Sequence, residues 1–444
     1  MTHTTRQLKL GAFLMATGHH VAAWRHPQVP ADAGLDFKHY KHLAQIAEAA
    51  RFDALFVADS VAAATGEAAS RMARSDHFEP LTLLSALSAV TEHIGLIATA
   101  TTSYNEPYHV ARKFASLDHL SGGRAGWNLV TSDAAAEAAN FGREEHIGHA
   151  ERYRRAREFH QVVTGLWDSW EDDAFIRDKA SGQYYDPGKR HLLDHSGEYF
   201  KVKGPLNVAR SPQGQPVVVQ AGASQTGREL AAQTAEVVFT AQTSLANAQA
   251  FYADLKGRLE AFGRNPDSLK IMPGVFVVVG ETQAQAWEKF EEFQALVEPE
   301  VGIALLGRML GNFDLSGYPP DGPLPELPLT DNGQQSRQQL LTDLAGSENL
   351  SLAQLGRRIA GGRGHYSLIG TPGQIADELQ NWFESDAADG FNVLVPHLPG
   401  GLEDFAQQVV PELQRRGLFR REYEGRTLRE NLGLARPGNR FVST

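Results

Sequence analysis

Short apolar runs rich in β-branched residues recur along the chain, separated by longer and more polar stretches. Most of these runs are nearly continuous in hydrophobicity rather than alternating, which is typical of parallel strands buried on both faces. The pattern predicts eight strands, at residues 8–13, 54–59, 94–100, 125–131, 216–222, 237–242, 271–279 and 391–398.

Between these runs, apolar positions recur with a helical period. The first such stretch, residues 36–52, places Tyr40, Leu43, Ile46 and Ala47 on one stripe. Seven more follow, at residues 79–93, 107–120, 149–167, 227–236, 247–263, 371–383 and 403–417. Strand and helix alternating eight times predict an α/β fold, a parallel (β/α)8 TIM barrel. A doubly wound sheet is the alternative; the count of eight and the closing C-terminal helix favour the barrel.

Several connections are too long for a minimal barrel of about 250 residues. The long segments are residues 14–36, 60–77, 132–148, 169–215 and 281–370. All but 169–215 follow the carboxyl ends of predicted strands, the edge where such barrels place their active sites. We therefore expect one barrel domain over residues 1–444 with lids or substrate walls inserted at that edge. The tail is expected to pack on a neighbouring surface or subunit, and we expect a homo-oligomer, a dimer or tetramer.

Composition narrows the chemistry. The 444 residues include no cysteine, which excludes disulfides, thiolate nucleophiles and cysteine-ligated metal clusters. A net charge of −11 argues against nucleic-acid or anionic-membrane partners. No signal peptide and no run of 18 apolar residues is found, so a cytoplasmic location is expected.

The glycine-rich stretch SGGRAGWNLVTS, residues 121–132, is not a phosphate loop by its context. Phosphate-binding glycines follow a strand and open a helix, whereas these follow a helix and open a strand. Gly122 and Gly123 are interpreted as a helix C-cap and turn, and Gly126 as a point of close backbone approach. The chemistry is then expected at the carboxyl end of the strand, from Asn128 to Ser132.

The stretch QAGASQTGRELAAQTAE, residues 220–236, has the opposite order, strand then helix. Ser224 is placed to cap the helix, leaving the first amides, those of Gln225, Thr226 and Gly227, directed outward. Such a helix start binds phosphate through its amides and dipole, although an ordinary capped loop has the same sequence features. The loop follows the fifth predicted strand, whereas the usual TIM-barrel phosphate loops follow the seventh and eighth.

Polar residues end other predicted strands or begin the next helices. Asp59 ends the second strand and Thr99 the third, which places both at the barrel mouth; capping and strand propensity are their structural alternatives. His149 and Tyr153 are four residues apart on one helix face. The loop after the first strand contributes His20 as a candidate proton donor.

Metal and serine-nucleophile motifs are missing. No H-E-x-x-H or G-x-S-x-G occurs, and His191 and His195 lie in a loop-to-strand segment rather than on a helix. We therefore predict no metal site.

Five blocks carry a family resemblance, in order along the chain: EPYHVARKFASLDHLSGGRAGWNLVTS, GHAERYRRAREF, GEYFKVKGPLNVARSPQGQPVVVQAGASQTGRELAA, GTPGQIADELQNWF and VVPELQRRGLFR. They resemble the flavin-dependent monooxygenases related to bacterial luciferase, in the branch of nitrilotriacetate monooxygenase component A. Long-chain alkane and dibenzothiophene-sulfone monooxygenases are relatives. The resemblance runs from about residue 8 to residue 440.

The resemblance implies an enzyme that uses reduced FMN supplied by a separate NAD(P)H:flavin reductase. One atom of O2 enters a small organic substrate and the other leaves as water. The flavin performs the redox chemistry, and the protein binds, orients and shields the flavin. Carried over by position, the FMN contacts fall on Asp59, Thr99, His149, Tyr153 and Ser224, and Asn128 fits the same role by its place at a strand end.

The substrate is less defined by the sequence. The blocks TGHHVAAWR and TTSYNEPYH resemble the branch that oxidises aminopolycarboxylates, and four arginines in predicted mouth loops could pair with carboxylates: Arg25, Arg71, Arg74 and Arg363. An alkane or organosulfur substrate is an alternative. So are hydride transfer with the deazaflavin F420 on the same barrel and flavin binding without catalysis.

Overall fold

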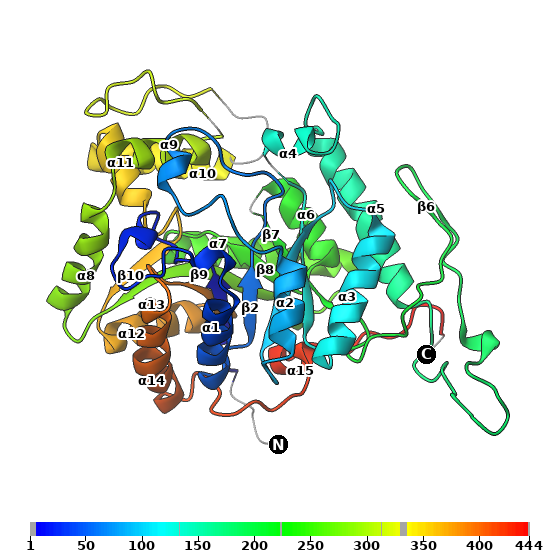
Figure 1. The fold of residues 1–444 in the computed structure, drawn as a ribbon. Helices are drawn as coiled ribbons and strands as arrows, with labels where there is room; N and C mark the ends of the chain where they lie inside the picture. The colour runs from blue at the N-terminus through cyan, green and yellow to red at the C-terminus, as the bar shows by residue number, and fades with distance from the viewer. Residues whose placement is uncertain (1–5, 133, 223, 312, 329–334, 443–444) are drawn as a thin grey trace.

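The computed structural model describes residues 6–132, 134–222, 224–311, 313–328 and 335–442. Eight parallel strands close into a barrel with helices on its outside, as predicted (Figure 1). The barrel strands are β1 (Lys9–Leu14), β2 (Ala54–Val57), β3 (Gly95–Thr101), β4 (Ala125–Val130), β7 (Val217–Ala221), β8 (Val237–Thr240), β9 (Lys270–Val279) and β11 (Gly390–Leu394).

Closure of the barrel depends on β9. Its first residues pair with β8, with Lys270 opposite Val237, and its middle pairs with β11, with Gly274 opposite Asn392. Strand β11 then pairs with β1, with Gly390 opposite Lys9. Every pairing in this sheet is parallel.

A ninth strand, β10 (Tyr366–Gly370), pairs with the second half of β9. This strand was not predicted, because it lies in the segment 281–370, which was expected to carry lids and walls rather than strands. The same segment contains helices α8 (Gln283–Ala295), α9 (Pro299–Met309), α10 (Gln335–Glu348) and α11 (Leu352–Ile359). In Figure 1, α9, α10 and α11 lie together above the barrel.

The helices predicted from the sequence are present; they follow barrel strands, except the seventh, which follows β10. They are α1 (Phe37–Ala49), α2 (Pro80–Ser88), α3 (Pro107–Ser121), α5 (His149–Trp167), α6 (Gln225–Thr234), α7 (Leu245–Arg258), α12 (Pro372–Glu384) and, after β11, α13 (Gly400–Asp404) with α14 (Val410–Arg415). Among the described residues, no helix is long and apolar enough to cross a membrane.

Burial on both faces explains the continuous apolar runs. In β3, Leu96, Ala98 and Ala100 belong to the large core between barrel and helices, whereas Ile97 belongs to the cluster inside the barrel with Phe13, Phe56 and Met272. A third cluster joins the long connections, with Val21, Met72, Leu306, Leu341 and Leu355 among its members. The loops 14–36 and 60–77 therefore pack on the helices of 281–370 over the barrel.

The glycine turn between α3 and β4 has the predicted structural role. Gly122 is the C-cap of α3 with φ +70°, and Gly123 follows with φ +100°. A Cβ atom on Gly126 would lie 2.8 Å from Cγ1 of Ile97, so close approach of β3 and β4 requires glycine. The C-terminal tail packs below this turn through α15 (Leu428–Leu432), and the backbone N–H of Leu428 donates to the carbonyl of Gly123.

Candidate active site

A cavity of about 310 Å³ opens at the carboxyl ends of β2, β3, β4 and β7. This volume is at the lower end of the range of about 300–1,000 Å³ that is usual for small-molecule sites. Five of the six residues predicted to contact the cofactor line it: Asp59, Thr99, His149, Tyr153 and Ser224. They come from four segments that are distant in sequence, and the parallel strands bring them to one edge.

One wall of the cavity is the N-terminus of α6. Ser224 caps this helix, its Oγ accepting from the backbone N–H of Gly227 at 3.1 Å. The first amides of the helix have no partner within it. A Cβ atom on Gly227 would lie 3.2 Å from Oη of Tyr153, so the tyrosine hydroxyl lies directly over the helix start. The helix follows the fifth barrel strand, as counted from the sequence, and its amides and dipole suit a phosphate group.

The start of α5 supplies the facing wall. The rings of His149 and Tyr153 lie with centroids 4.8 Å apart. Between them in sequence, the buried Arg152 lines the same cavity and contacts the carbonyl of Ser132 and the ring of His146. Burial, and then the charge of Arg152, lower the pKa of His149. Sequence reasoning did not select Arg152, although its position three residues after His149 places it on the same helix face.

Asn128 lies one layer deeper than the cavity lining. Its Nδ2 donates to Oγ1 of Thr99 at 2.8 Å, and that hydroxyl donates to the carbonyl of Val57 at 2.9 Å. The Oδ1 of Asn128 is buried and has no hydrogen-bond partner among the described residues. The threonine hydroxyl thus links the asparagine to the cavity wall and fixes which side of its amide faces inward.

Asp59 faces His77 across the mouth of the cavity. The Oδ1 of Asp59 lies 3.4 Å from Nε2 of His77, and this hydrogen bond is the main cause of a raised pKa for the histidine. A further carboxylate, Glu137, lines the cavity from the short helix α4 (Ala135–Ala139) and accepts from Oγ of Ser60 at 2.9 Å. The segment 132–148 was expected at this edge, but nothing in its sequence pattern shows that Glu137 is the residue that faces the cavity.

His20 does not join this group. It is fully buried between the first loop and α8, with its ring 5.5 Å from that of Phe293 and its Nε2 3.4 Å from Oε1 of Gln294. Burial lowers its pKa to about 4, so the imidazole is neutral at neutral pH. Its position and its low pKa both fail to support the predicted role as proton donor to the cavity.

The four arginines considered for carboxylate binding separate into two pairs. Arg25 and Arg71 both form ion pairs with Glu298 at the start of α9. Arg74 and Arg363 instead direct guanidinium nitrogens at the sulfur of Met15, at 2.9 and 3.1 Å. Arg25 and Arg71 thus join the loops 14–36 and 60–77 to the segment 281–370. Arg74 and Arg363 are directed at the barrel mouth.

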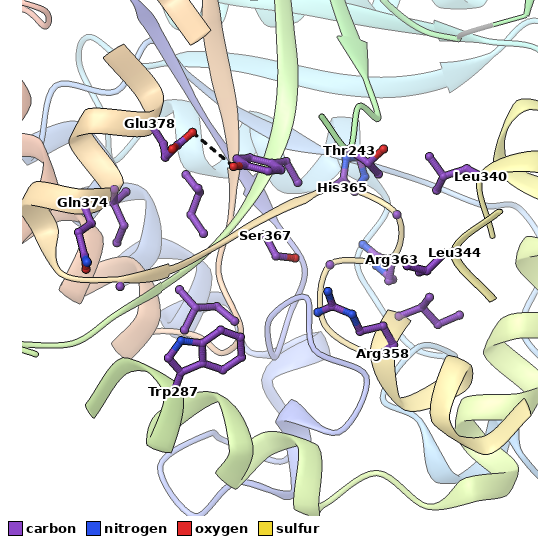
Figure 2. A pocket seen from close by; sticks show the side chains of 18 of the residues that line it. Thr243, Trp287, Leu340, Leu344, Arg358, Arg363, His365, Ser367, Gln374 and Glu378 are labelled. Atoms are coloured by element: carbon purple, nitrogen blue, oxygen red, sulfur yellow. Dashed lines mark hydrogen bonds between the residues drawn. The ribbon is translucent and has the colours of Figure 1, made fainter. Parts of the chain in front are cut away.

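A second cavity, of about 640 Å³, lies outside the barrel against β10. Figure 2 shows Arg358, Arg363 and His365 towards one side of it, with Trp287, Gln374 and Glu378 towards the other. None of the residues predicted to contact the cofactor lines this cavity. Its link to the barrel is Arg363, whose Nη2 also lies 2.8 Å from Nδ1 of His19.

Comparisons with known proteins agree with this architecture. Residues 12–389 match the family model of the luciferase-like monooxygenases. The chain is 52% identical over 443 residues to N-acetyl-S-(2-succino)cysteine monooxygenase of Bacillus subtilis, covering all of both chains. It is also 52% identical to nitrilotriacetate monooxygenase component A of Aminobacter aminovorans, covering 98% of each.

A solved structure extends the comparison to the flavin. The riboflavin lyase determined with modified FMN and riboflavin has a TM-score of 0.87 and 33% identity to this chain, over 96% of both. The family match, the long alignments and the closed parallel barrel agree with one another. The chain belongs to the luciferase-like monooxygenase family, and it is an oxidoreductase of that family.

Proposed function

We propose that this protein is the oxygenating component of a two-component monooxygenase that uses reduced FMN from a separate NAD(P)H:flavin reductase. It would insert one oxygen atom of O2 into a small organic compound bearing carboxylates, of the nitrilotriacetate type. The observation that carries the proposal is the convergence of a serine-capped helix start, Tyr153 and the Thr99–Asn128 pair on one cavity.

The donor set fits FMN from end to end. Ser224, the first amides of α6 and the hydroxyl of Tyr153 would hold the phosphate. Asn128, with its unpartnered buried oxygen, and Thr99 would face the ribityl chain or ring. When bound, reduced FMN supplies the electrons that activate O2. Residues of α4, held over the cavity by Glu137 and Ser60, would exclude water from that chemistry.

The substrate class rests on the relatives. The two relatives at 52% identity are named for N-acetyl-S-(2-succino)cysteine and nitrilotriacetate, compounds that each carry several carboxylates. The second is named as a component A, which suggests a separate partner that would supply reduced flavin.

The test is oxygen consumption by the full chain supplied with a flavin reductase, NADH and FMN. We expect consumption that depends on substrate, and a product one oxygen heavier or dealkylated by mass spectrometry. The panel should contain nitrilotriacetate, N-acetyl-S-(2-succino)cysteine, a sulfone and an alkane. Oxidation of none of them by protein that demonstrably binds reduced FMN would contradict the proposal.

A further inference from the structure

Three arginines from separate segments converge on two methionine sulfurs beside the barrel mouth. Arg74 and Arg363 reach the sulfur of Met15, and Nη2 of Arg308, on α9, lies 3.3 Å from the sulfur of Met72. A thioether is a weak acceptor for a guanidinium, which is matched instead to carboxylate or phosphate. The contacts therefore occupy donors that a bound anion would satisfy better.

The charges of Arg74 and Arg308 are not neutralised within the described part of the chain. Neither forms an ion pair there, whereas Arg25, in the loop 14–36, and Arg71, in the loop 60–77, both pair with Glu298. Nη2 of Arg74 also donates to the carbonyls of Gly18 and His19, both at 3.1 Å. Gathering like charges without a counter-ion costs free energy, which a bound anion would recover.

The two side chains differ in exposure, because Arg74 is half-buried and Arg308 is exposed. Burial, and then the charge of Arg308, lower the pKa of Arg74 to about 10, so it stays charged at neutral pH. Arg308 is exposed to solvent, yet desolvation by neighbouring protein lowers its pKa as well. An exposed guanidinium with neighbouring protein close to it can be reached by a small anion from solvent.

Chain connections and charge link this group of arginines to both cavities. Arg74 belongs to the loop that runs from Asp59 to His77, and its charge acts on the pKa of His77, the partner of Asp59. On the other side, Arg363 lines the cavity of Figure 2. The apolar cluster of Val21, Met72 and Leu306 fixes the two loops and α9 relative to one another.

We propose that Arg74 and Arg308, with Arg363 beside them, form a subsite that binds the carboxylates of the substrate next to the flavin. Two adjacent guanidiniums from different elements suit a compound with at least two carboxylates, and they disfavour an alkane or a neutral sulfone. That the bound compound is then oxidised rests on the proposed function; the anion subsite itself does not.

Binding without turnover tests the subsite directly. The full chain, in metal-free buffer without reductase, is titrated calorimetrically with nitrilotriacetate, N-acetyl-S-(2-succino)cysteine and tricarballylate. We expect at least one to bind, and Arg308→Met to weaken that binding at least tenfold. Because Arg308 is exposed and bonds only to a sulfur among the described residues, this variant should fold normally. Arg74→Lys is the second variant, with a smaller expected loss, and Arg25→Met is the matched control, with less than a twofold change.

Three results would overturn the subsite: no binding of any of the three acids by the wild type, unchanged binding by Arg308→Met, or equal binding of sulfate or of the trimethyl ester of nitrilotriacetate. Turnover separates the two proposals. Arginine-dependent binding without oxidation of any compound would refute the monooxygenase assignment alone. Oxidation of nitrilotriacetate by Arg308→Met with unchanged KM would refute the subsite alone, whereas the expected result is a raised KM with kcat within twofold.

Discussion

At the scale of single residues, Ser224 and Tyr153 define the phosphate end of the site. Replacing Ser224 by Ala removes the cap of α6 and one hydroxyl from the cavity, and Tyr153→Phe removes the hydroxyl over the helix start. We expect each change to weaken FMN binding about tenfold, the loss of roughly one good hydrogen bond. Quenching of flavin fluorescence on titration measures this.

The matched control for that prediction is Ser244, which caps α7 in the same way, with its Oγ accepting from the N–H of Asn247 at 3.3 Å. Ser244→Ala and Ser224→Ala should each cost about 1 kcal/mol of unfolding free energy. Only Ser224→Ala should affect FMN. Equal FMN binding by both alanine variants would show that the phosphate lies elsewhere.

The residues that sequence could identify are those whose position follows from strand topology. Asp59, Thr99 and Ser224 lie within three residues of the carboxyl ends of their strands, and parallel strands must end at one edge. Glu137 and Arg308 could not be found, because each lies on a helix inside an insertion whose docking is decided by tertiary contacts. The sequence also could not show that the ring of His20 packs against Phe293 and Gln294 of α8 and does not line the cavity.

At the scale of elements, the turn between α3 and β4 shows why adjacent glycines are not equivalent. A Cβ atom on Gly122 would meet no atom within 4 Å, whereas one on Gly123 would lie 2.8 Å from Cγ2 of Thr427 in the tail. Gly122→Ala should therefore lower the unfolding free energy only by the cost of the left-handed backbone conformation, about 1–2 kcal/mol. Gly123→Ala should cost more, because it also displaces the tail from the turn.

Urea unfolding of the two variants measures the difference, and limited trypsin digestion locates it. The tail segment at Arg426, next to Thr427, should be cut faster in Gly123→Ala than in Gly122→Ala or the wild type. Identical digestion of the two variants would mean that the tail is not held by this turn. In that case, the hydrogen bond that the N–H of Leu428 donates to Gly123 would be too weak to anchor the tail.

The strands were predictable where burial on both faces leaves a long apolar run, as in β3 and β9. Strand β10 was not, because only Leu368 and Gly370 of its five residues are buried and Ser367 is exposed. It is defined by pairing with the second half of β9, beyond the region where β9 pairs with β8. Such a pairing depends on the exceptional length of β9 and leaves little trace in the periodicity of residues 366–370.

At the scale of the whole molecule, Phe293 on α8 lies among three histidines from two distant segments. The rings of His20, His26 and His397 lie 5.5, 4.8 and 5.0 Å from it. This cluster joins the loop after β1 to α8 and to the turn after β11. Since these segments surround the barrel mouth, protonation within the cluster should act on the stability of the assembled fold.

His397 allows that coupling to be measured. Burial, and then the charge of His26, lower its pKa to about 4. In the unfolded chain a histidine takes up a proton near pH 6.5, so the native state is favoured fully above that pH and loses stability as the pH falls towards 4. At pH 5 this loss is about 2 kcal/mol.

His397→Phe keeps an aromatic ring, and the buried Nδ1 has no hydrogen-bond partner to lose among the described residues. We therefore expect urea unfolding at pH 7.5 and 5.0 to show a smaller loss of stability on acidification for the variant, by about 2 kcal/mol. Equal losses for variant and wild type would mean that His397 already takes up its proton in the folded protein and that acid does not act through this cluster.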